Sequence, residues 1–145
     1  MTTVAIVEDN AVVGASLRRI VESAPDCTCA GVWRSGEEAL EKVPAFRPDV
    51  VLMDIHLPGL TGIETTARLK QQLPDLLVIM VTVYRDHDKI FDALKAGACG
   101  YLLKRSSPDE VRRAIADVRT GGAPMSAEIA RRVVEAFHRD RKSVV

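Results

Sequence analysis

The sequence predicts an α/β fold: a doubly wound, five-stranded parallel sheet with helices on both faces and an extra C-terminal helix. Apolar runs of strand length alternate along the chain with amphipathic stretches of helix length. This order is typical of parallel strands joined by helical crossovers. Four of the five runs are nearly continuous in valine, isoleucine, leucine and methionine, as expected of strands that are buried on both faces.

Five segments are the predicted strands, and amphipathic helices are predicted between them. The strands are expected at 3–8, 27–33, 49–54, 76–82 and 99–104. Apolar residues return at helical spacing within 11–24 and again within 107–119. One face of each of these two segments would therefore pack on the sheet.

Three of the predicted helices begin with the pattern of a capping box, in which a serine or threonine is followed three residues later by glutamate. The pattern occurs at Ser35–Glu38, Thr61–Glu64 and Ser107–Glu110. Pro108 adds a further start signal, because proline is favoured in the first helical position. These starts place a helix after the second, third and fifth strands.

The end of the chain predicts one more helix beyond the sheet. Residues 120–124, Thr-Gly-Gly-Ala-Pro, form a break rich in glycine and proline. Ser126 would then cap a sixth helix. Its apolar residues Ile129, Val133 and Phe137 would lie along one stripe.

Composition and charge exclude several classes of protein. The chain has 145 residues, enough for one domain with a substantial core. Its formal net charge is zero, so the whole chain gives no sign of nucleic-acid binding. No apolar run approaches the roughly 18 residues that a membrane span needs, and the first residues lack the pattern of a signal peptide. With only three cysteines, no disulfide framework is expected, and the cytoplasm is the predicted location.

Polar residues stand at the ends of the predicted strands, although Arg34, after the second strand, has no obvious role. In open parallel sheets, ligands bind beyond the carboxyl ends of the strands, so residues at these ends are candidates for a site. The first strand ends in Glu8 and Asp9, the third in Asp54, the fourth in Thr82 and the fifth in Lys104. If the first and third strands are neighbours, three carboxylates meet at one edge of the sheet.

These carboxylates predict a metal site and a phosphoryl acceptor. Carboxylates at close range repel one another unless a cation joins them. Oxygen ligands without a histidine or cysteine cluster suit Mg²⁺, which typically takes one or two carboxylates, waters and a phosphate oxygen. A carboxylate can also attack phosphorus and form an aspartyl phosphate. We therefore expect phosphoryl transfer to Asp54, with Mg²⁺ on one side and Thr82 and Lys104 on the other.

Together these residues resemble the receiver domain of bacterial two-component response regulators, which are phosphorylated on aspartate by histidine kinases. The matching motifs are the acidic pair at 8–9, Asp54 within MDIHLPGLTG, Thr82 in MVT, and Lys104 at the end of GYLLK. The resemblance covers residues 3–120. It implies a flavodoxin-like sheet with strand order 2-1-3-4-5.

The resemblance also implies which residues bind the phosphoryl group and the metal. Asp54 is the implied phosphoacceptor. Mg²⁺ would be held by Glu8, Asp9, Asp54 and the backbone carbonyl of His56.

A conformational switch is implied as well. Thr82 and Lys104 would contact the phosphoryl oxygens, and the ring of Tyr101 would change position on activation. This would alter the face formed by the fourth helix, the fifth strand and the fifth helix. His56 and Tyr84 stand at positions where receivers vary, and they would tune the lifetime of the phosphoryl group.

The last segment resembles the linker of LuxR/NarL-type transcription regulators. We therefore expect a receiver domain at 1–121 and a linker with the C-terminal helix at 122–145. The implied partners are a sensor histidine kinase and, after phosphorylation, a second copy of the chain. DNA would be reached only through an output domain absent from this sequence, and no membrane partner is expected. The chain would not be an enzyme beyond self-phosphotransfer and autodephosphorylation, and a stand-alone receiver acting by protein–protein contact is the alternative.

Two other functions fit the sequence less well. A Mg²⁺-dependent phosphatase of the haloacid-dehalogenase type would carry a second aspartate where this chain has His56. A flavodoxin-like FMN carrier would need a phosphate-binding loop where Glu8 and Asp9 would repel phosphate in the absence of a metal. One residue departs from many receivers: Arg105 follows Lys104 in place of proline, which leaves the geometry of that peptide bond open.

Overall fold

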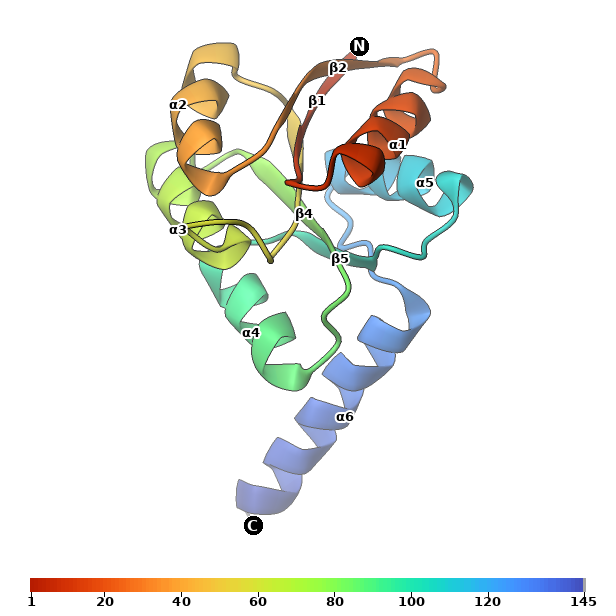
Figure 1. Ribbon diagram of the computed structural model, residues 1–145. Coiled ribbons are helices and arrows are strands. Elements are labelled where there is room, and N and C mark those ends of the chain that lie inside the picture. The colour runs from red at the N-terminus through yellow and green to blue at the C-terminus, as the bar shows by residue number, and fades with distance from the viewer. Residues whose placement is uncertain (145) are drawn as a thin grey trace.

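The computed structural model describes the backbone of residues 1–144 and the side chains of residues 1–139. Within this range strands and helices alternate as predicted, and a sixth helix follows the last pair (Figure 1). No helix in this part of the chain is long and apolar enough to cross a membrane. The elements are β1 (Thr2–Val7), α1 (Ala11–Glu22), β2 (Cys27–Trp33), α2 (Gly36–Phe46), β3 (Val50–Met53), α3 (Gly62–Gln72), β4 (Leu77–Thr82), α4 (His87–Ala96), β5 (Gly100–Leu103), α5 (Pro108–Arg119) and α6 (Ala127–Val144).

The five strands form one parallel sheet in the order β2-β1-β3-β4-β5, which confirms the expected fold and order. β1 and β3 are neighbours, with Val7 opposite Met53, and Met53 is in turn opposite Met80 of β4. The central strands therefore end at the same edge of the sheet. The polar residues that follow them come together at this edge.

Helices cover both faces of the sheet, and each face has its own apolar core. α1 and α5 lie on one face, whereas α2, α3 and α4 lie on the other (Figure 1). Successive residues of β1 point to opposite faces: Val4 and Ile6 belong to the first core, Ala5 and Val7 to the second. Because both faces are buried, the strands read as nearly continuous apolar runs.

Two of the three predicted capping boxes are complete. At Thr61 and Ser107, the side chain accepts the N–H of the glutamate three residues later, and that glutamate accepts the N–H of the capping residue. The third is only half formed. Ser35 accepts the N–H of Glu38 at 3.1 Å, but the carboxylate of Glu38 accepts the N–H of Arg34 instead, also at 3.1 Å.

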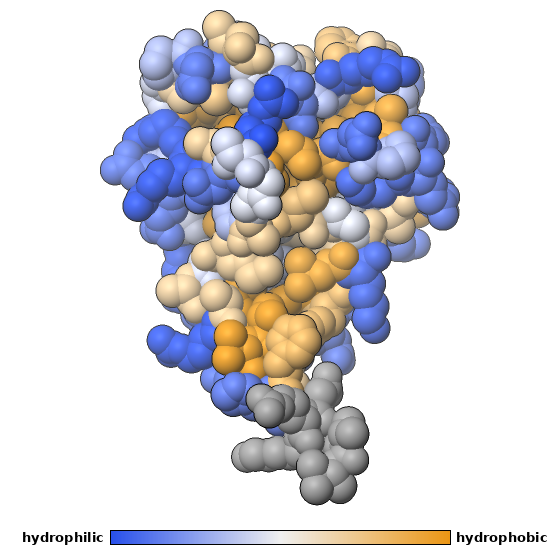
Figure 2. Space-filling view, turned by 180° about the vertical axis from the view of Figure 1, so that it is seen from behind, coloured by the Kyte–Doolittle hydropathy of each residue, from blue (hydrophilic) through white to orange (hydrophobic). Residues whose placement is uncertain are grey.

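The last helix packs on the apolar core only through its first half; further along, Nη2 of Arg139 lies 3.0 Å from Nε2 of His87 in α4. Ile129 is fully buried and Val133 is half-buried against the core under α4, but Phe137 is 62% exposed. The apolar stripe is therefore buried at its start and exposed at Phe137. The reason is that α6 projects beyond the sheet (Figure 1), so its second half has no strand beneath it. Apolar residues gather on the surface along this part of the helix (Figure 2).

The start of α6 also differs from the prediction. Ser126 does precede the helix, and its carbonyl accepts the N–H of Ala130 at 2.9 Å. Its hydroxyl, however, accepts the N–H of Leu103 in β5 at 3.0 Å. The side chain that the sequence predicts as a helix cap therefore joins the helix to the sheet instead.

Candidate functional site

A cleft of about 550 Å³ opens at the carboxyl ends of β1, β3 and β5. The sheet order brings together the segments that follow these strands, although they are far apart in the sequence. The cleft is lined by Glu8, Asp9, Asn10, Asp54, His56, Val83, Tyr84 and Lys104.

Three carboxylates meet in this cleft, as predicted. Glu8 and Asp54 are buried, with 2% and 3% of their surface exposed, whereas Asp9 is exposed. One carboxylate oxygen from each lies within 4.8 Å of the others. A donor set made only of oxygen atoms fits a hard divalent cation such as Mg²⁺, so the cluster can bind a metal.

A single ammonium group joins two of the carboxylates. Nζ of Lys104 lies 2.8 Å from Oε1 of Glu8 and 2.9 Å from Oδ2 of Asp54. Desolvation lowers the pKa of Lys104, but its bonds to the two carboxylates outweigh this effect and raise the pKa above its ordinary value. The lysine is therefore held in its charged form. The peptide bond between Lys104 and Arg105 is trans, as are all the others described.

Glu8 carries a charge that its surroundings do not fully balance. Burial raises the pKa of its carboxyl above the ordinary value, and the nearby charge of Asp54 adds to this rise. The bond from Lys104 opposes it, as does the N–H of Asn10, which lies 3.0 Å from Oε2. A divalent cation beside Glu8 would relieve the remaining cost of the buried charge.

The hydroxyl of Thr82 is buried without a partner. Thr82 is the last residue of β4 and is fully buried. Its Oγ1 has no hydrogen bond to another described residue, while its backbone carbonyl accepts the N–H of Lys104 at 2.9 Å. Leaving a buried hydroxyl unpaired is unfavourable, so this group is a free donor for a ligand oxygen.

Tyr101, predicted for switching, and Tyr84 and His56, predicted to tune lifetime, form one chain of contacts. Tyr101 is fully buried, and its hydroxyl donates to the backbone carbonyl of Tyr84 at 2.8 Å. Burial raises the pKa of this hydroxyl. At the rim of the cleft, the hydroxyl of Tyr84 lies 3.5 Å from Nδ1 of His56. The ammonium group of Lys89 lies 5.6 Å from the centroid of the Tyr84 ring.

Sequence analysis missed two residues that position the site. Asn10 lines the cleft and caps α1, accepting the N–H groups of Val12 and Val13 at 3.0 and 3.1 Å. Gly62 begins α3, and a Cβ there would lie 1.9 Å from the carbonyl oxygen of Asp54, so only glycine allows this close approach. Asparagine just before a helical pattern is a readable cap signal. No local pattern indicates the contact at Gly62.

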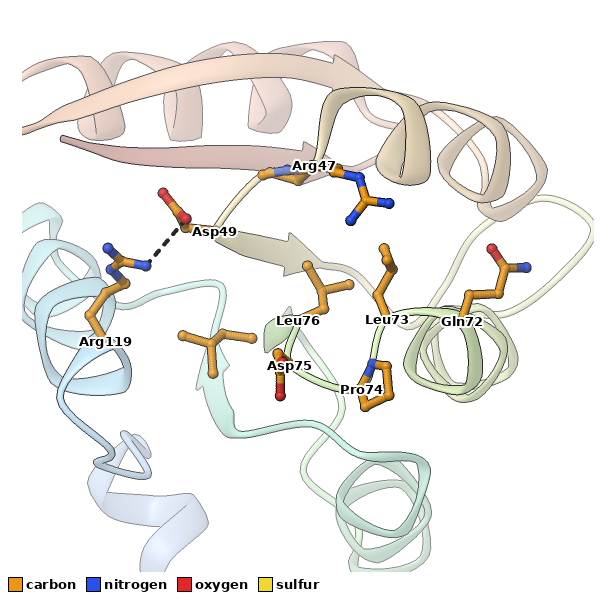
Figure 3. A pocket seen from close by; sticks show the side chains of 10 residues that line it. Arg47, Asp49, Gln72, Leu73, Pro74, Asp75, Leu76 and Arg119 are labelled. Atoms are coloured by element: carbon orange, nitrogen blue, oxygen red, sulfur yellow. Dashed lines mark ion pairs between the residues drawn. The ribbon is translucent and has the colours of Figure 1, made fainter.

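A second cleft, of about 510 Å³, lies at the opposite, amino-terminal edge of the sheet (Figure 3). Oδ1 of Asp49 lies 3.3 Å from Nη1 of Arg119, and its Oδ2 accepts the N–H of Thr3 at 2.9 Å. The carboxylate of Asp49 is therefore already bound on both oxygens.

Comparison with known proteins gives one consistent family. Residues 4–116 match the family described as response regulator receiver domain. The transcriptional regulatory protein LnrK of Bacillus subtilis is 32% identical over 142 residues, which cover 98% of this chain and 64% of LnrK. The response regulator UvrY of Escherichia coli K12 is 35% identical over 133 residues, which cover 92% of this chain and 61% of UvrY.

Solved structures support the same relationship. The crystal structure of a two-component response regulator of the LuxR family from Aurantimonas sp. SI85-9A1 superimposes with a TM-score of 0.90 at 30% identity. The match covers 94% of this chain and 99% of that chain. The chain thus corresponds to nearly all of that solved chain, but it spans only 61% to 64% of the length of the two curated relatives.

Proposed function

Since the chain belongs to the response regulator receiver domain family, we propose that it is a phosphorylation-dependent signalling switch. Asp54 accepts a phosphoryl group from the phosphohistidine of a sensor histidine kinase, with Mg²⁺ bound beside it. The observation that carries this proposal is the bridge from Lys104 to Asp54 and Glu8, in a cleft that also contains Asp9.

The residues of the cleft suit transfer to Asp54. As an oxygen of Asp54 bonds to phosphorus, the bond from phosphorus to the histidine nitrogen breaks, and charge on the phosphoryl oxygens must be neutralised. Lys104 already lies 2.9 Å from the Asp54 carboxylate, and the free hydroxyl of Thr82 adds a donor. Mg²⁺, held by the three carboxylates and the backbone carbonyl of His56, would supply further positive charge.

The phosphoryl group then changes a surface. It adds about −1.5 to −2 charges, which attract Lys104 and the hydroxyl of Thr82. An inward Thr82 leaves space for the ring of Tyr101 and favours the buried position that the ring already has in this structure. A local change in charge thereby shifts the packing equilibrium of the face of α4, β5 and α5. His56 and Tyr84, which meet at the mouth of the cleft, set the lifetime of the phosphoryl group.

We further propose that this face controls transcription, by pairing with a second copy or by contacting an output domain. LnrK, which shares 32% identity, is named a transcriptional regulatory protein. In this proposal residues 1–121 form the receiver, residues 122–145 form the linker with its helix, and DNA is reached only through a further domain. A stand-alone receiver that acts by protein–protein contact is the alternative. DNA footprinting with the protein expressed from the intact gene would distinguish a transcription regulator from a stand-alone receiver.

Incubation with a small phosphodonor and Mg²⁺ tests the acceptor. Intact-mass spectrometry should show one added phosphoryl group on the wild type and none on Asp54→Ala. The matched control is Asp49→Ala, which removes an aspartate at the opposite edge of the sheet and should be modified like the wild type. Equal modification of Asp54→Ala would refute the assignment, and steady release of phosphate without a stored group would indicate a phosphatase.

A further inference from the structure

The segment between α5 and α6 is built into the edge of the sheet beside Tyr101. The N–H of Tyr101 donates to the carbonyl of Pro124 at 2.9 Å, and the N–H of Ser126 donates to the carbonyl of Tyr101 at 3.1 Å. Tyr101 and Met125 form a parallel bridge between these bonds. Residues 124–126 therefore pair with the edge of β5 at Tyr101 through a single parallel bridge and cover the edge there.

Packing holds the same segment against Tyr101. A Cβ on Gly100 would lie 2.7 Å from the carbonyl oxygen of Pro124, so the close approach depends on glycine. Ile129, in the first turns of α6, is fully buried in the apolar core that also contains Tyr101. The start of α6 is thus part of the surroundings of the tyrosine.

Glu128, in the first turn of α6, joins two loops whose preceding residues, Tyr84 and Lys104, line the cleft. Its carboxylate lies 3.2 Å from Nη1 of Arg85 and 2.6 Å from Nη2 of Arg105. Arg85 directly follows Tyr84, and Arg105 directly follows Lys104. One side chain of α6 therefore ties the loop after β4 to the loop after β5.

The carboxylate of Glu128 is bound as a charged group. Desolvation raises the pKa of Glu128, but hydrogen bonds from Arg85 and Arg132 and the charge of Arg105 outweigh this and lower the pKa below its ordinary value. Single exposed ion pairs contribute little to stability, whereas networks of several charges can contribute more. Three arginines on one carboxylate form such a network.

We propose that Glu128 is a positioning residue that couples α6 to the phosphoryl cleft: docking of residues 124–129 holds Tyr101 in its buried position and so favours phosphorylation of Asp54. The proposal rests on the function proposed above for Asp54. Its direction follows from one observation, that the docked α6 and the buried Tyr101 occur together, combined with the switch proposed above, in which an inward Thr82 makes room for the same ring. By linkage, a phosphoryl group at Asp54 must tighten the docking of α6 by the same factor.

Amide hydrogen exchange tests the link between Glu128 and Tyr101 without any phosphoryl group. In Glu128→Gln, the amides of Tyr101 and Ser126 should exchange about fivefold faster than in the wild type, because the edge bonds open more often. Glu135→Gln, a matched change at an exposed glutamate of the same helix, should leave both rates unchanged. Wild-type rates in Glu128→Gln would overturn the proposal. So would equal acceleration throughout the sheet, which would mean that Glu128 affects only global stability.

Binding of beryllofluoride with Mg²⁺, followed by fluorine NMR, tests the coupling to Asp54. Glu128→Gln should bind this phosphoryl mimic about fivefold more weakly than the wild type, and in the wild type the bound mimic should slow exchange at Ser126 by a similar factor. If the wild type and Glu128→Gln bind equally, the role of Glu128 is refuted while that of Asp54 stands. If the wild type does not bind the mimic at all, the function proposed for Asp54 fails, and the coupling fails with it.

Discussion

The two clefts at opposite edges of the sheet are similar in size but differ in charge balance. The amino-terminal cleft encloses about 510 Å³ and the carboxyl-terminal one about 550 Å³. In the first, Asp49 is bound by Arg119 and by the N–H of Thr3, and the two charged side chains are 35% and 41% exposed. In the second, Glu8 and Asp54 are almost fully buried and share the ammonium group of Lys104, while Asp9 adds a third negative charge.

This difference teaches that chemistry, rather than volume, distinguishes the functional cleft. The N–H of Thr3 and the guanidinium group of Arg119 bind the carboxylate of Asp49 at the amino-terminal edge, so Asp49 needs no ligand to balance its charge. At the carboxyl-terminal edge, two buried carboxylates with one lysine leave negative charge that the protein itself does not neutralise. Buried charges of this kind are unfavourable for folding and gather at functional sites.

The largest effect on stability is expected from removal of the central ammonium group. Lys104→Met should lower the free energy of unfolding by about 3 kcal/mol at neutral pH, because two buried carboxylates lose their partner. Urea denaturation measures the change. Added Mg²⁺ should restore more stability in Lys104→Met than it adds to the wild type. A loss below about 1 kcal/mol, which is typical of surface pairs, would mean that the two clefts do not differ as described.

A smaller effect is expected from the exposed carboxylate. Asp9→Ala should weaken Mg²⁺ binding at least about tenfold, since loss of a ligand should exceed the 10–100-fold effects of residues that only orient ligands. Asp49→Ala removes an aspartate from the other cleft and should leave Mg²⁺ binding unchanged. Isothermal titration calorimetry measures the Mg²⁺ affinity of both variants and of the wild type. Equal loss of affinity in the two variants would show that Mg²⁺ does not bind specifically in the carboxyl-terminal cleft.

The affinity for Mg²⁺ should rise with pH, by up to about tenfold per pH unit if one proton is released. Burial raises the pKa of Glu8, so a proton competes with the metal until the pH exceeds that pKa. Calorimetry in buffers of different ionisation enthalpy measures the proton release, and its absence would contradict this account.

In the absence of metal, the free energy of unfolding should fall as the pH rises, whereas the affinity for Mg²⁺ should increase. Because the folded pKa of Glu8 is raised, its contribution to stability is fully present below the ordinary value of 4.5 and is lost as the pH rises through the folded value. Urea denaturation at a series of pH values should therefore show a loss in the wild type that Glu8→Gln lacks. The same pH dependence in both proteins would assign it to other groups.

The smallest effect is expected at the amino-terminal cleft. Arg119→Met removes one partner of a pair that is substantially exposed, and it should change the free energy of unfolding by less than about 1 kcal/mol. Phosphorylation of Asp54 should not change. Thermal unfolding combined with the mass assay measures both. If Arg119→Met lowered the free energy of unfolding as much as Lys104→Met does, the two clefts would not differ in charge balance as described.

Much of the fold could be predicted because its signals are local. Each predicted strand is present, and each observed end lies within one residue of the predicted one, since a buried strand shows itself as an apolar run. The helices after β3 and β5 begin at capping boxes that need only four residues to form. Several residues of the cleft could be named for a similar reason: Glu8, Asp54 and Lys104 directly follow the apolar runs of β1, β3 and β5.

Only the tertiary structure decided how these parts meet. Lys104 reaches two carboxylates from strands far apart in sequence, and Gly62 packs against the backbone of Asp54. Residues 124–126 pair with β5 through backbone bonds, which leave no pattern in the side chains. The apolar spacing of α6 continues to Phe137, which is nonetheless exposed. Spacing determines which face of a helix can be buried, but burial also needs a neighbour, and the arrangement of the whole chain determines where neighbours lie.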